Sequence, residues 1–225
     1  MQFLDVYKTF LENYGAQLWW PTTPEGEVNP QYTGGSKTNK QRLEVCLGAI
    51  LTQNTSWKNV EKAIVNLNRE RLVDLEKIQK IKKERLEELI RPSGFYKQKA
   101  ERLKTFADFI FGKNFSEVTR EDLLKLKGIG PETADSILLY ACEKPEFVVD
   151  AYTKRIFGRF GLINLEEYQG VKEIFEKNLP KDVKLYQEFH ALIVEHAKRF
   201  CKKEPECANC QLNSHCKHYK AKLGN

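Results

Sequence analysis

The sequence predicts an all-α protein. Apolar residues recur at intervals of three and four along most of the chain, as they do on one face of a helix, and strand-like alternation is nearly absent. Proline, glycine and capping residues fall between these periodic segments, where helices begin and end. The pattern accounts for about ten short helices.

The periodic segments follow one another from the first residue to residue 200. We expect an amphipathic helix over residues 1–15 and further helices over residues 43–51, 57–67, 75–81, 84–90, 100–111, 121–127, 134–141, 154–162, 168–179 and 186–200. Thr119 with Asp122 resembles a capping box, and Pro131 suits a first helical position behind Gly130. Residues 21–40 are rich in Pro, Gly, Thr and Asn, which predicts a long loop.

Composition limits the class of protein. The 225 residues carry a net charge of +6, a moderate excess that fits either a polyanionic partner or a merely soluble surface. A chain of this length buries about 70% of its unfolded surface and needs no disulfides to fold. Acidic Asp5 and Glu12 interrupt the N-terminal segment, so a secretion signal is not expected. No apolar run approaches the ~20 residues of a membrane span, and we expect an intracellular protein with reduced thiols.

Four of the six cysteines crowd near the C-terminus in the pattern Cys201-x5-Cys207-x2-Cys210-x5-Cys216. So tight a group indicates a metal site and not a disulfide framework. Four thiolates suit zinc or an iron–sulfur cubane. Only one CxxC pair is present, so the open spacing favours [4Fe–4S], while zinc with His196 or His215 as a substitute ligand stays an alternative. The remaining two, Cys46 and Cys142, are expected to be small core residues.

The stretch LKGIGPETAD, residues 126–135, places a two-glycine corner between two predicted helices. Gly128 and Gly130 allow a positive φ and a close approach of the backbone to a ligand. The amides of Ile129, Gly130 and Glu132 would point out of the next helix and bind an anion such as a phosphate. A plain glycine cap followed by a helix-initiating proline explains the same spacing.

The segment FVVDAYTKRIFGRFG follows this corner, and Asp150 opens its helix. A carboxylate in this position is either an ordinary helix cap or a reactive group. Together, LKGIGPETAD and VVD resemble the helix-hairpin-helix motif and the catalytic aspartate of the endonuclease III superfamily of DNA glycosylases. The resemblance covers residues from about 40 to 216, because LGAILTQNT, SGFYKQKAERL and the four terminal cysteines also have counterparts in that family.

The resemblance implies a two-lobed helix-hairpin-helix DNA glycosylase fold with a C-terminal iron–sulfur cluster loop at residues 201–216. Residues 40–144 would form a six-helix barrel that ends in the hairpin. Residues 1–39 and 145–225 would combine into a second lobe, with double-stranded DNA in the cleft between the lobes. We expect a monomer without membrane contact, working in the cytoplasm or nucleoid on DNA that contains a damaged base.

The resemblance also implies roles for single residues. Asp150 would act at the deoxyribose, and Gln53 and Phe95 would enter the duplex. The hairpin residues that would hold a phosphate are Gly128, Ile129 and Gly130. Lys202 and Lys203, inside the cysteine loop, either reach a phosphate or form a solvated pair.

Glu132 bears on the chemistry. In family members that cut the backbone, a lysine forms a Schiff base with the sugar, and that lysine falls at Glu132 here. A carboxylate forms no imine, so the sequence predicts a monofunctional glycosylase that leaves an abasic site. Glu132 itself would be only a first-turn acid that favours the helix dipole. A bifunctional enzyme with a displaced lysine is the alternative.

Three tryptophans bear on the substrate. The stretches QLWWPT and TQNTSW, with Trp19, Trp20 and Trp57, resemble the 3-methyladenine subgroup, in which such rings line the base pocket. Cationic alkylated purines such as 3-methyladenine and 7-methylguanine leave readily and bind aromatic faces. Core anchoring explains the pair Trp19–Trp20 equally well. Some members of the subgroup lack the iron–sulfur cysteines, so this chain would belong to another branch.

Two other functions stay open. One is a glycosylase for pyrimidine damage or mismatches, with or without lyase activity. The other is a non-catalytic DNA-binding iron–sulfur protein, in which Asp150 would be dispensable.

Overall fold

The computed structural model describes residues 1–224 and is built almost wholly of helices. The α-helices are α1 (Phe3–Tyr14), α2 (Asn39–Leu51), α3 (Trp57–Arg69), α4 (Leu75–Lys80), α5 (Lys83–Ile90), α6 (Tyr96–Ile110), α7 (Arg120–Leu124), α8 (Pro131–Tyr140), α9 (Ala151–Phe160), α10 (Tyr168–Asn178), α11 (Val183–Arg199) and α12 (Lys217–Leu223). Short 3-10 turns are η1 (Arg91–Ser93), η2 (Phe115–Glu117) and η3 (Asn213–His215). No strand occurs among residues 1–224, where one isolated bridge joins Thr22 to Gln31. The all-α prediction is therefore confirmed.

The predicted helix boundaries follow local capping chemistry. Thr119 caps α7 by accepting a hydrogen bond from the Asp122 amide at 3.1 Å. Gly130 is the N-cap of α8 and Pro131 its first residue, as the sequence predicts. Helix α7 ends at Leu124, before the expected residue 127. The polar helix α12 was not expected, because it has no apolar stripe.

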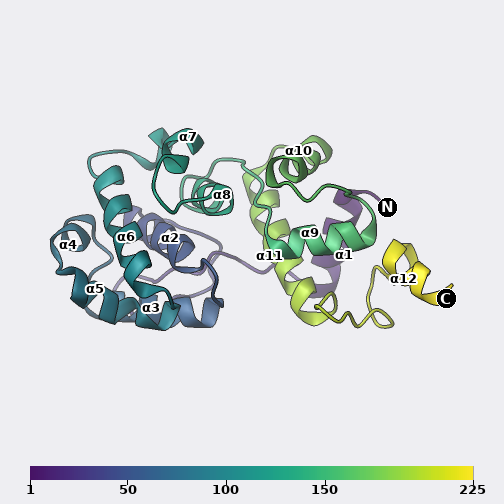
Figure 1. Cartoon of the computed structure of the whole chain (residues 1–225), viewed down its shortest axis with the longest axis horizontal. Helices are drawn as coiled ribbons and strands as arrows, with labels where there is room; N and C mark the ends of the chain where they lie inside the picture. The colour runs from purple at the N-terminus through teal and green to yellow at the C-terminus, as the bar shows by residue number, and fades with distance from the viewer. Residues whose placement is uncertain (225) are drawn as a thin grey trace. The chain divides into compact units, whose positions relative to one another are not determined.

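The chain divides into two compact units. The terminal unit comprises Met1–Gln17 and Pro145–Asn225, and the central unit comprises Leu18–Lys144. The central unit thus begins at Leu18 and not at residue 40, the boundary expected from the sequence. Figure 1 labels α2 to α8 in the central unit and α1 with α9 to α12 in the terminal unit.

Helix α2 forms the core of the central unit. Every residue from Leu43 to Leu51 is buried, since α3, α6 and α8 all pack against this helix. Helices α4 and α5 pack on α6, and α7 packs on α8. A nearly continuous apolar run such as VCLGAIL is typical of a helix that neighbours cover on every side.

Aromatic side chains fill the core of the terminal unit. Phe3 of α1 stacks on Phe157 of α9 at a centroid distance of 5.3 Å, and Phe147 stacks on Phe175 of α10 at 4.3 Å. Helix α11 packs against α1 and α9, and α12 packs against α9. Among the helices of residues 1–224, none combines the length and the apolar character that crossing a membrane would require.

Candidate active site

Asp150 is the N-cap of α9 in the terminal unit. Its Oδ1 accepts hydrogen bonds from the Thr153 amide at 2.7 Å and from the Thr153 hydroxyl at 2.8 Å. Its Oδ2 lies 3.7 Å from Nε2 of His190, which α11 supplies. Burial raises the pKa of Asp150, but His190 and the Thr153 donors outweigh burial, so the net pKa of the carboxyl lies below its usual value. Asp150 is therefore a fixed, ionised carboxylate.

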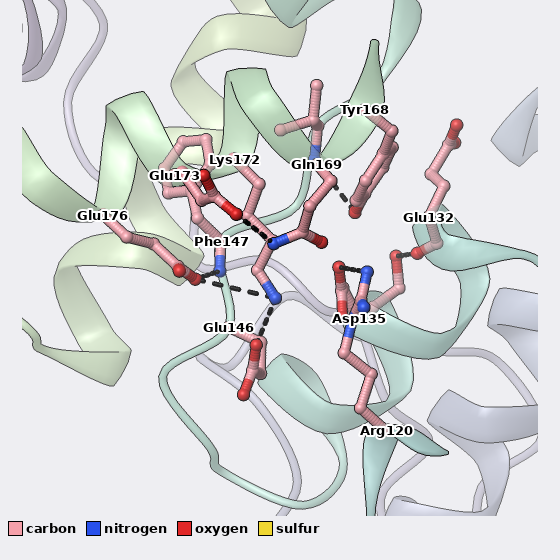
Figure 2. A network of polar contacts seen from close by, with 12 residues as sticks. Arg120, Glu132, Asp135, Glu146, Phe147, Tyr168, Gln169, Lys172, Glu173 and Glu176 are labelled. Atoms are coloured by element: carbon pink, nitrogen blue, oxygen red, sulfur yellow. Dashed lines mark hydrogen bonds and ion pairs between the residues drawn. The ribbon is translucent and has the colours of Figure 1, made fainter. Parts of the chain in front are cut away.

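Polar contacts hold the extended segment that precedes Asp150 against α10 (Figure 2). Buried Lys172 forms an ion pair with Glu146 and lies 3.7 Å from Glu176. Glu176 also accepts a hydrogen bond from the Phe147 amide at 2.9 Å. The Val149 amide reaches the Tyr168 hydroxyl at 3.4 Å. A buried cation between two carboxylates fixes the backbone that precedes Asp150, since breaking such a pair leaves an uncompensated charge.

In the central unit, the two glycines of the hairpin turn have different conformations. Gly128 has φ of +87°, and a Cβ there would overlap the Arg102 side chain of α6. Gly130 has φ of −93°, which any residue adopts, and among the described residues a Cβ there would meet open space. Of the two glycines that allow a positive φ, only Gly128 adopts one. Gly130 thus borders open space among the described residues, whereas Gly128 accommodates Arg102.

The two helices of the hairpin are joined by a buried ion pair, also drawn in Figure 2. Arg120 of α7 donates to Asp135 of α8 from Nε at 2.7 Å and from a terminal nitrogen at 3.3 Å. The Asp135 side chain is fully buried. This two-point contact fixes the angle between α7 and α8. Glu132 is exposed in the first turn of α8, where a carboxylate favours the helix dipole.

Gln53 lies in the turn after α2, and its side chain is held on the hairpin. Its amide nitrogen donates to the Gly128 carbonyl at 3.0 Å and to the Thr133 hydroxyl at 2.9 Å. Its amide oxygen accepts from Arg102. The structure thus brings Gln53 and the hairpin together, and Gln53 must leave three partners to enter a duplex.

Phe95 lies at the tip of the turn before α6. Its φ is +46° in the left-handed region, and its side chain is 63% exposed. An exposed aromatic ring in a strained conformation is costly for folding alone, which points to a role outside the fold.

The three tryptophans form one aromatic cluster in the central unit. Trp57 lies edge-on to Trp19 and Trp20, with centroid distances of 4.9 and 5.5 Å. Trp20 is 4% exposed and also packs on Tyr140 at 5.3 Å. Its ring lies so close to α2 that a Cβ at Gly48 would be 3.1 Å away. Trp20 is thus a core anchor, as one alternative predicted, while Trp19 and Trp57 are partly exposed.

A buried carboxylate fixes the segment that carries the tryptophan pair. Glu44 of α2 accepts from the Thr23 amide at 2.7 Å and from the Asn68 side chain at 2.9 Å. Burial raises the pKa of Glu44 despite these donors. Glu44 was not expected to have a structural role, although an acid inside the apolar run LEVCLGAIL is a signal for a buried, hydrogen-bonded carboxylate.

The four cysteines of the terminal loop line one pocket of the terminal unit, together with Ile156, Arg159, Phe160, His196, Phe200, Pro205, Leu212, Asn213, His218 and Tyr219. Arg159 of α9 donates to the Cys201 sulfur at 3.5 Å, and the Cys216 thiol donates to the Arg159 carbonyl at 3.5 Å. His196 Nε2 lies 3.7 Å from the Cys210 sulfur. His215 instead contacts Ser214. Burial raises the pKa of Cys210 to about 11.

The donor set fits a cluster, but the thiols are not arranged around a metal. Within the described residues, no group of three or more His, Cys, Asp or Glu side chains has metal-holding geometry. Thiolate ligands lose their protons when a metal binds, so a raised thiol pKa opposes loading at low pH. The iron–sulfur loop therefore stays a prediction.

Lys202 and Lys203 are exposed in this loop. Their backbone carbonyls accept hydrogen bonds from Arg159 at 2.6 and 2.8 Å. The Lys202 ammonium pairs with Glu206 at 2.5 Å. Lys202 is thus part of a surface ion pair, and a phosphate contact by Lys202 or Lys203 stays a prediction.

The central unit carries the two-glycine hairpin, and the terminal unit carries the ionised aspartate, that the sequence predicts for a helix-hairpin-helix DNA glycosylase. The family model described as HhH-GPD superfamily base excision DNA repair protein matches residues 47–181, and the chain belongs to that superfamily. It is a base excision repair glycosylase, an enzyme that acts on N-glycosidic bonds in DNA.

Three of the known relatives are similar over most of the chain. MJ1434 of Methanocaldococcus jannaschii, a provisionally named DNA repair glycosylase, is 49% identical over 94% of both chains. Endonuclease III of Thermotoga maritima is 34% identical over 79% of this chain and 84% of that protein. The crystal structure of H. pylori 3-methyladenine DNA glycosylase bound to 1,N6-ethenoadenine is 35% identical, with a TM-score of 0.70 over 87% of this chain and 95% of that chain.

Proposed function

We propose that the protein is a monofunctional glycosylase that removes alkylated purines, such as 3-methyladenine and 7-methylguanine, from double-stranded DNA. The observation that carries this substrate class is the cluster of Trp19, Trp20 and Trp57. Indole faces attract cationic bases, and alkylation makes purines cationic. The similarity to the H. pylori 3-methyladenine glycosylase supports the same substrate class.

Asp150 would act on the sugar of the extruded nucleotide. Thr153 occupies Oδ1, and Nε2 of His190 lies 3.7 Å from Oδ2, so Oδ2 is the less tightly held oxygen and the one that would face the sugar. The bond between C1′ and the base nitrogen breaks, the base departs with the electron pair, and positive charge develops on the sugar. A fixed carboxylate stabilises this charge and accepts a proton from the water that forms the new bond to C1′.

The chain would leave an abasic site uncut. Glu132 occupies the position at which the lyase members of the family carry a lysine, and a carboxylate cannot form the Schiff base. The exposed first-turn position of Glu132 is compatible with a role in helix electrostatics alone.

The remaining DNA contacts divide between the two units. In the central unit, the hairpin Gly128–Gly130 would hold a phosphate, and Gln53 and Phe95 would enter the duplex. In the terminal unit, Asp150 would supply the chemistry and Lys203 would add a phosphate contact. We expect a monomer to carry all of these groups.

A [4Fe–4S] cluster would be held by Cys201, Cys207, Cys210 and Cys216. Four free thiols that line one pocket support this ligand set, and the similarity to endonuclease III of T. maritima supports it further. When bound, a cluster cross-links a polar loop that has little apolar surface of its own. Yellow-brown colour and an iron content near four per chain would separate it from zinc.

Release of free bases tests the substrate class. Purified protein is incubated with duplex DNA treated with dimethyl sulfate, and with duplexes that contain thymine glycol or a T:G mismatch, and released bases are separated by chromatography. We expect methylpurines from the first substrate only. Trp19→Ala, which alters a partly exposed ring, should reduce that release, while borohydride should trap no covalent adduct. Release of thymine glycol or thymine without methylpurines would overturn the proposal.

The 34% identity to an endonuclease III favours a second candidate, a glycosylase for damaged pyrimidines. The same experiment decides between them, because a pyrimidine enzyme would act on thymine glycol. A borohydride-trapped adduct with either substrate would assign a lysine nucleophile outside position 132.

A further inference from the structure

Lys99 is a buried lysine of the central unit that the chemistry above does not use. It lies near the start of α6 and is 1% exposed. Its ammonium donates to the Leu51 carbonyl at 2.8 Å and to the Ser93 carbonyl at 2.7 Å. Both partners are neutral, so Lys99 is held by hydrogen bonds to backbone and not by an ion pair. A buried charge with this environment is expensive and is retained for a reason.

The two carbonyls belong to the segments that precede the candidate duplex-entering residues. Leu51 is the last residue of α2, two residues before Gln53, and Ser93 ends η1, two residues before Phe95. Carbonyls at helix ends have no partner within the helix and attract a cation. The Lys99 amide also donates to the Phe95 carbonyl at 3.0 Å. One residue therefore connects both loops.

Both loops need such a tie, because each contains a residue in the left-handed region. Asn54, next to Gln53, has φ of +53°, and Phe95 has φ of +46°. Non-glycine residues in this region cost free energy and persist only where neighbouring contacts hold them. One turn further along α6, Arg102 holds the Gln53 side chain. Helix α6 thus presents two cations, one to the backbone of both loops and one to Gln53.

We propose that Lys99 is a positioning residue that fixes the Gln53 and Phe95 loops relative to each other, so that both enter the duplex together when a base is extruded. The inference rests on the proposed function for the assignment of these loops to DNA. It adds a role for a residue that touches neither DNA nor the reacting sugar. Without the ammonium, the loops would still exist but would separate and enter independently.

Helix α6 also offers a control lysine, which is partly buried where Lys99 is fully buried. Lys104 also donates to two carbonyls, those of Ile78 at 3.2 Å and Gln79 at 2.9 Å, at the end of α4. Lys99→Met and Lys104→Met each remove one ammonium and leave two carbonyls without it. The two variants differ in whether those carbonyls belong to the candidate DNA-entering loops. Lys99→Gln, which keeps a neutral donor, replaces Lys99→Met if the latter does not fold.

The first measurement is independent of base release. A duplex with an abasic analogue opposite 2-aminopurine reports insertion of side chains through the fluorescence of that base. At saturating protein we expect Lys99→Met to lose most of the fluorescence change that wild type produces, while Lys104→Met keeps it. Equal fluorescence changes for wild type and Lys99→Met would overturn the proposal.

The second measurement compares a methylated purine in a paired duplex with the same base in a single-nucleotide bulge, where it is already unstacked. Leaving buried carbonyls unsatisfied costs enough to slow extrusion, so Lys99→Met should lower the single-turnover rate on the paired duplex about tenfold more than on the bulge. Lys104→Met should lower both rates equally. If Lys99→Met lowers the rate equally on the two substrates, Lys99 contributes only to stability and the proposal is wrong.

The two failures can be told apart. If wild type releases no methylpurine from either substrate, the proposed substrate class fails, while the fluorescence measurement still reports on Lys99. If wild type releases methylpurines and Lys99→Met behaves as Lys104→Met in both measurements, only the role of Lys99 fails.

Discussion

The N-termini of α8 and α9 differ in their caps: a side chain caps α9, whereas a glycine begins α8. Helix α9 is capped by its own anion, because Asp150 accepts two hydrogen bonds from Thr153. Helix α8 has Gly130 as its N-cap, which carries no side chain to accept from the helix amides. Both helices have ten residues, so their dipoles are comparable.

The difference separates two tasks of one enzyme. A helix end that lacks an internal cap keeps its donors for an external anion, as a phosphate-binding turn requires. A helix end that is capped by a carboxylate fixes and ionises that carboxylate, as a group that faces a sugar cation requires. On the proposed function, the N-terminus of α8 would bind a phosphate, and the N-terminus of α9 would hold the reactive carboxylate.

Asp150→Asn should have the largest effect, because it removes the charge but keeps a good cap. Asparagine is as strong an N-cap as aspartate, so the only stability lost should be the contribution of the carboxylate charge. Base release under single-turnover conditions should fall at least about 100-fold, since no carboxylate remains to stabilise the sugar cation or accept a proton.

A thermal melt and the affinity for a duplex with an abasic analogue serve as controls for this variant. Asp150→Ala loses the helix cap, so its free energy of unfolding should be about 1 kcal/mol lower than that of Asp150→Asn and its melting temperature should be lower. Base release by Asp150→Asn at the wild-type rate would show that the carboxylate is only a cap.

Gly128→Ala should come next, through stability. An alanine at a φ of +87° costs about 1–2 kcal/mol, and its Cβ would also displace Arg102 and with it the partner of Gln53. We expect a free energy of unfolding lowered by about 2 kcal/mol or more, measured by urea denaturation. A free energy of unfolding equal to that of wild type would mean that the turn accommodates alanine without strain.

Gly130→Ala should act on binding instead of stability. The backbone there has φ of −93°, and the new methyl group would meet open space among the described residues. Alanine is a poorer N-cap, which costs less than about 1 kcal/mol. The methyl group would stand in front of the amides that face the phosphate, so Kd for duplex DNA should rise about fivefold or more. If Gly128 were the glycine that faces the ligand, Gly128→Ala would raise Kd for duplex DNA and Gly130→Ala would leave it unchanged.

The sequence predicts the parts of the site that depend on neighbouring residues. Thr119, Gly130 with Pro131, and the capping position of Asp150 follow from contacts that span three or four residues. The positive φ of Gly128 follows from the turn itself. Local capping chemistry thus specifies both helix starts compared above.

The rest of the site depends on contacts between distant segments, which periodicity does not reveal. Gln53 is bonded to a hairpin 75 residues away, and Lys99 to a carbonyl 48 residues away. Lys99 occupies an apolar-stripe position with Leu103 and Phe106, so a lysine in that stripe was the one available signal. No local pattern in the sequence predicts that His190 lies beside Asp150. The two residues meet because aromatic side chains pack α9 against α11.

The smallest expected effect is on stability in acid, and it tests what keeps Asp150 ionised at the start of α9. Because the pKa of Asp150 is lowered by folding, the ionised carboxylate stabilises the folded state above its unfolded pKa of about 3.9, and this contribution is lost as pH falls through the folded value. Asp150→Asn lacks this contribution at every pH. The difference in free energy of unfolding between wild type and Asp150→Asn should therefore shrink below about pH 4, as urea denaturation at several pH values would measure. His190→Gln removes the imidazole beside Oδ2, so the folded-state pKa of Asp150 should rise towards its unfolded value. The stability lost in acid should then be smaller and should be lost completely at a higher pH than in wild type. If wild type and His190→Gln lose the same amount of stability over the same pH range, the Thr153 cap alone keeps Asp150 ionised.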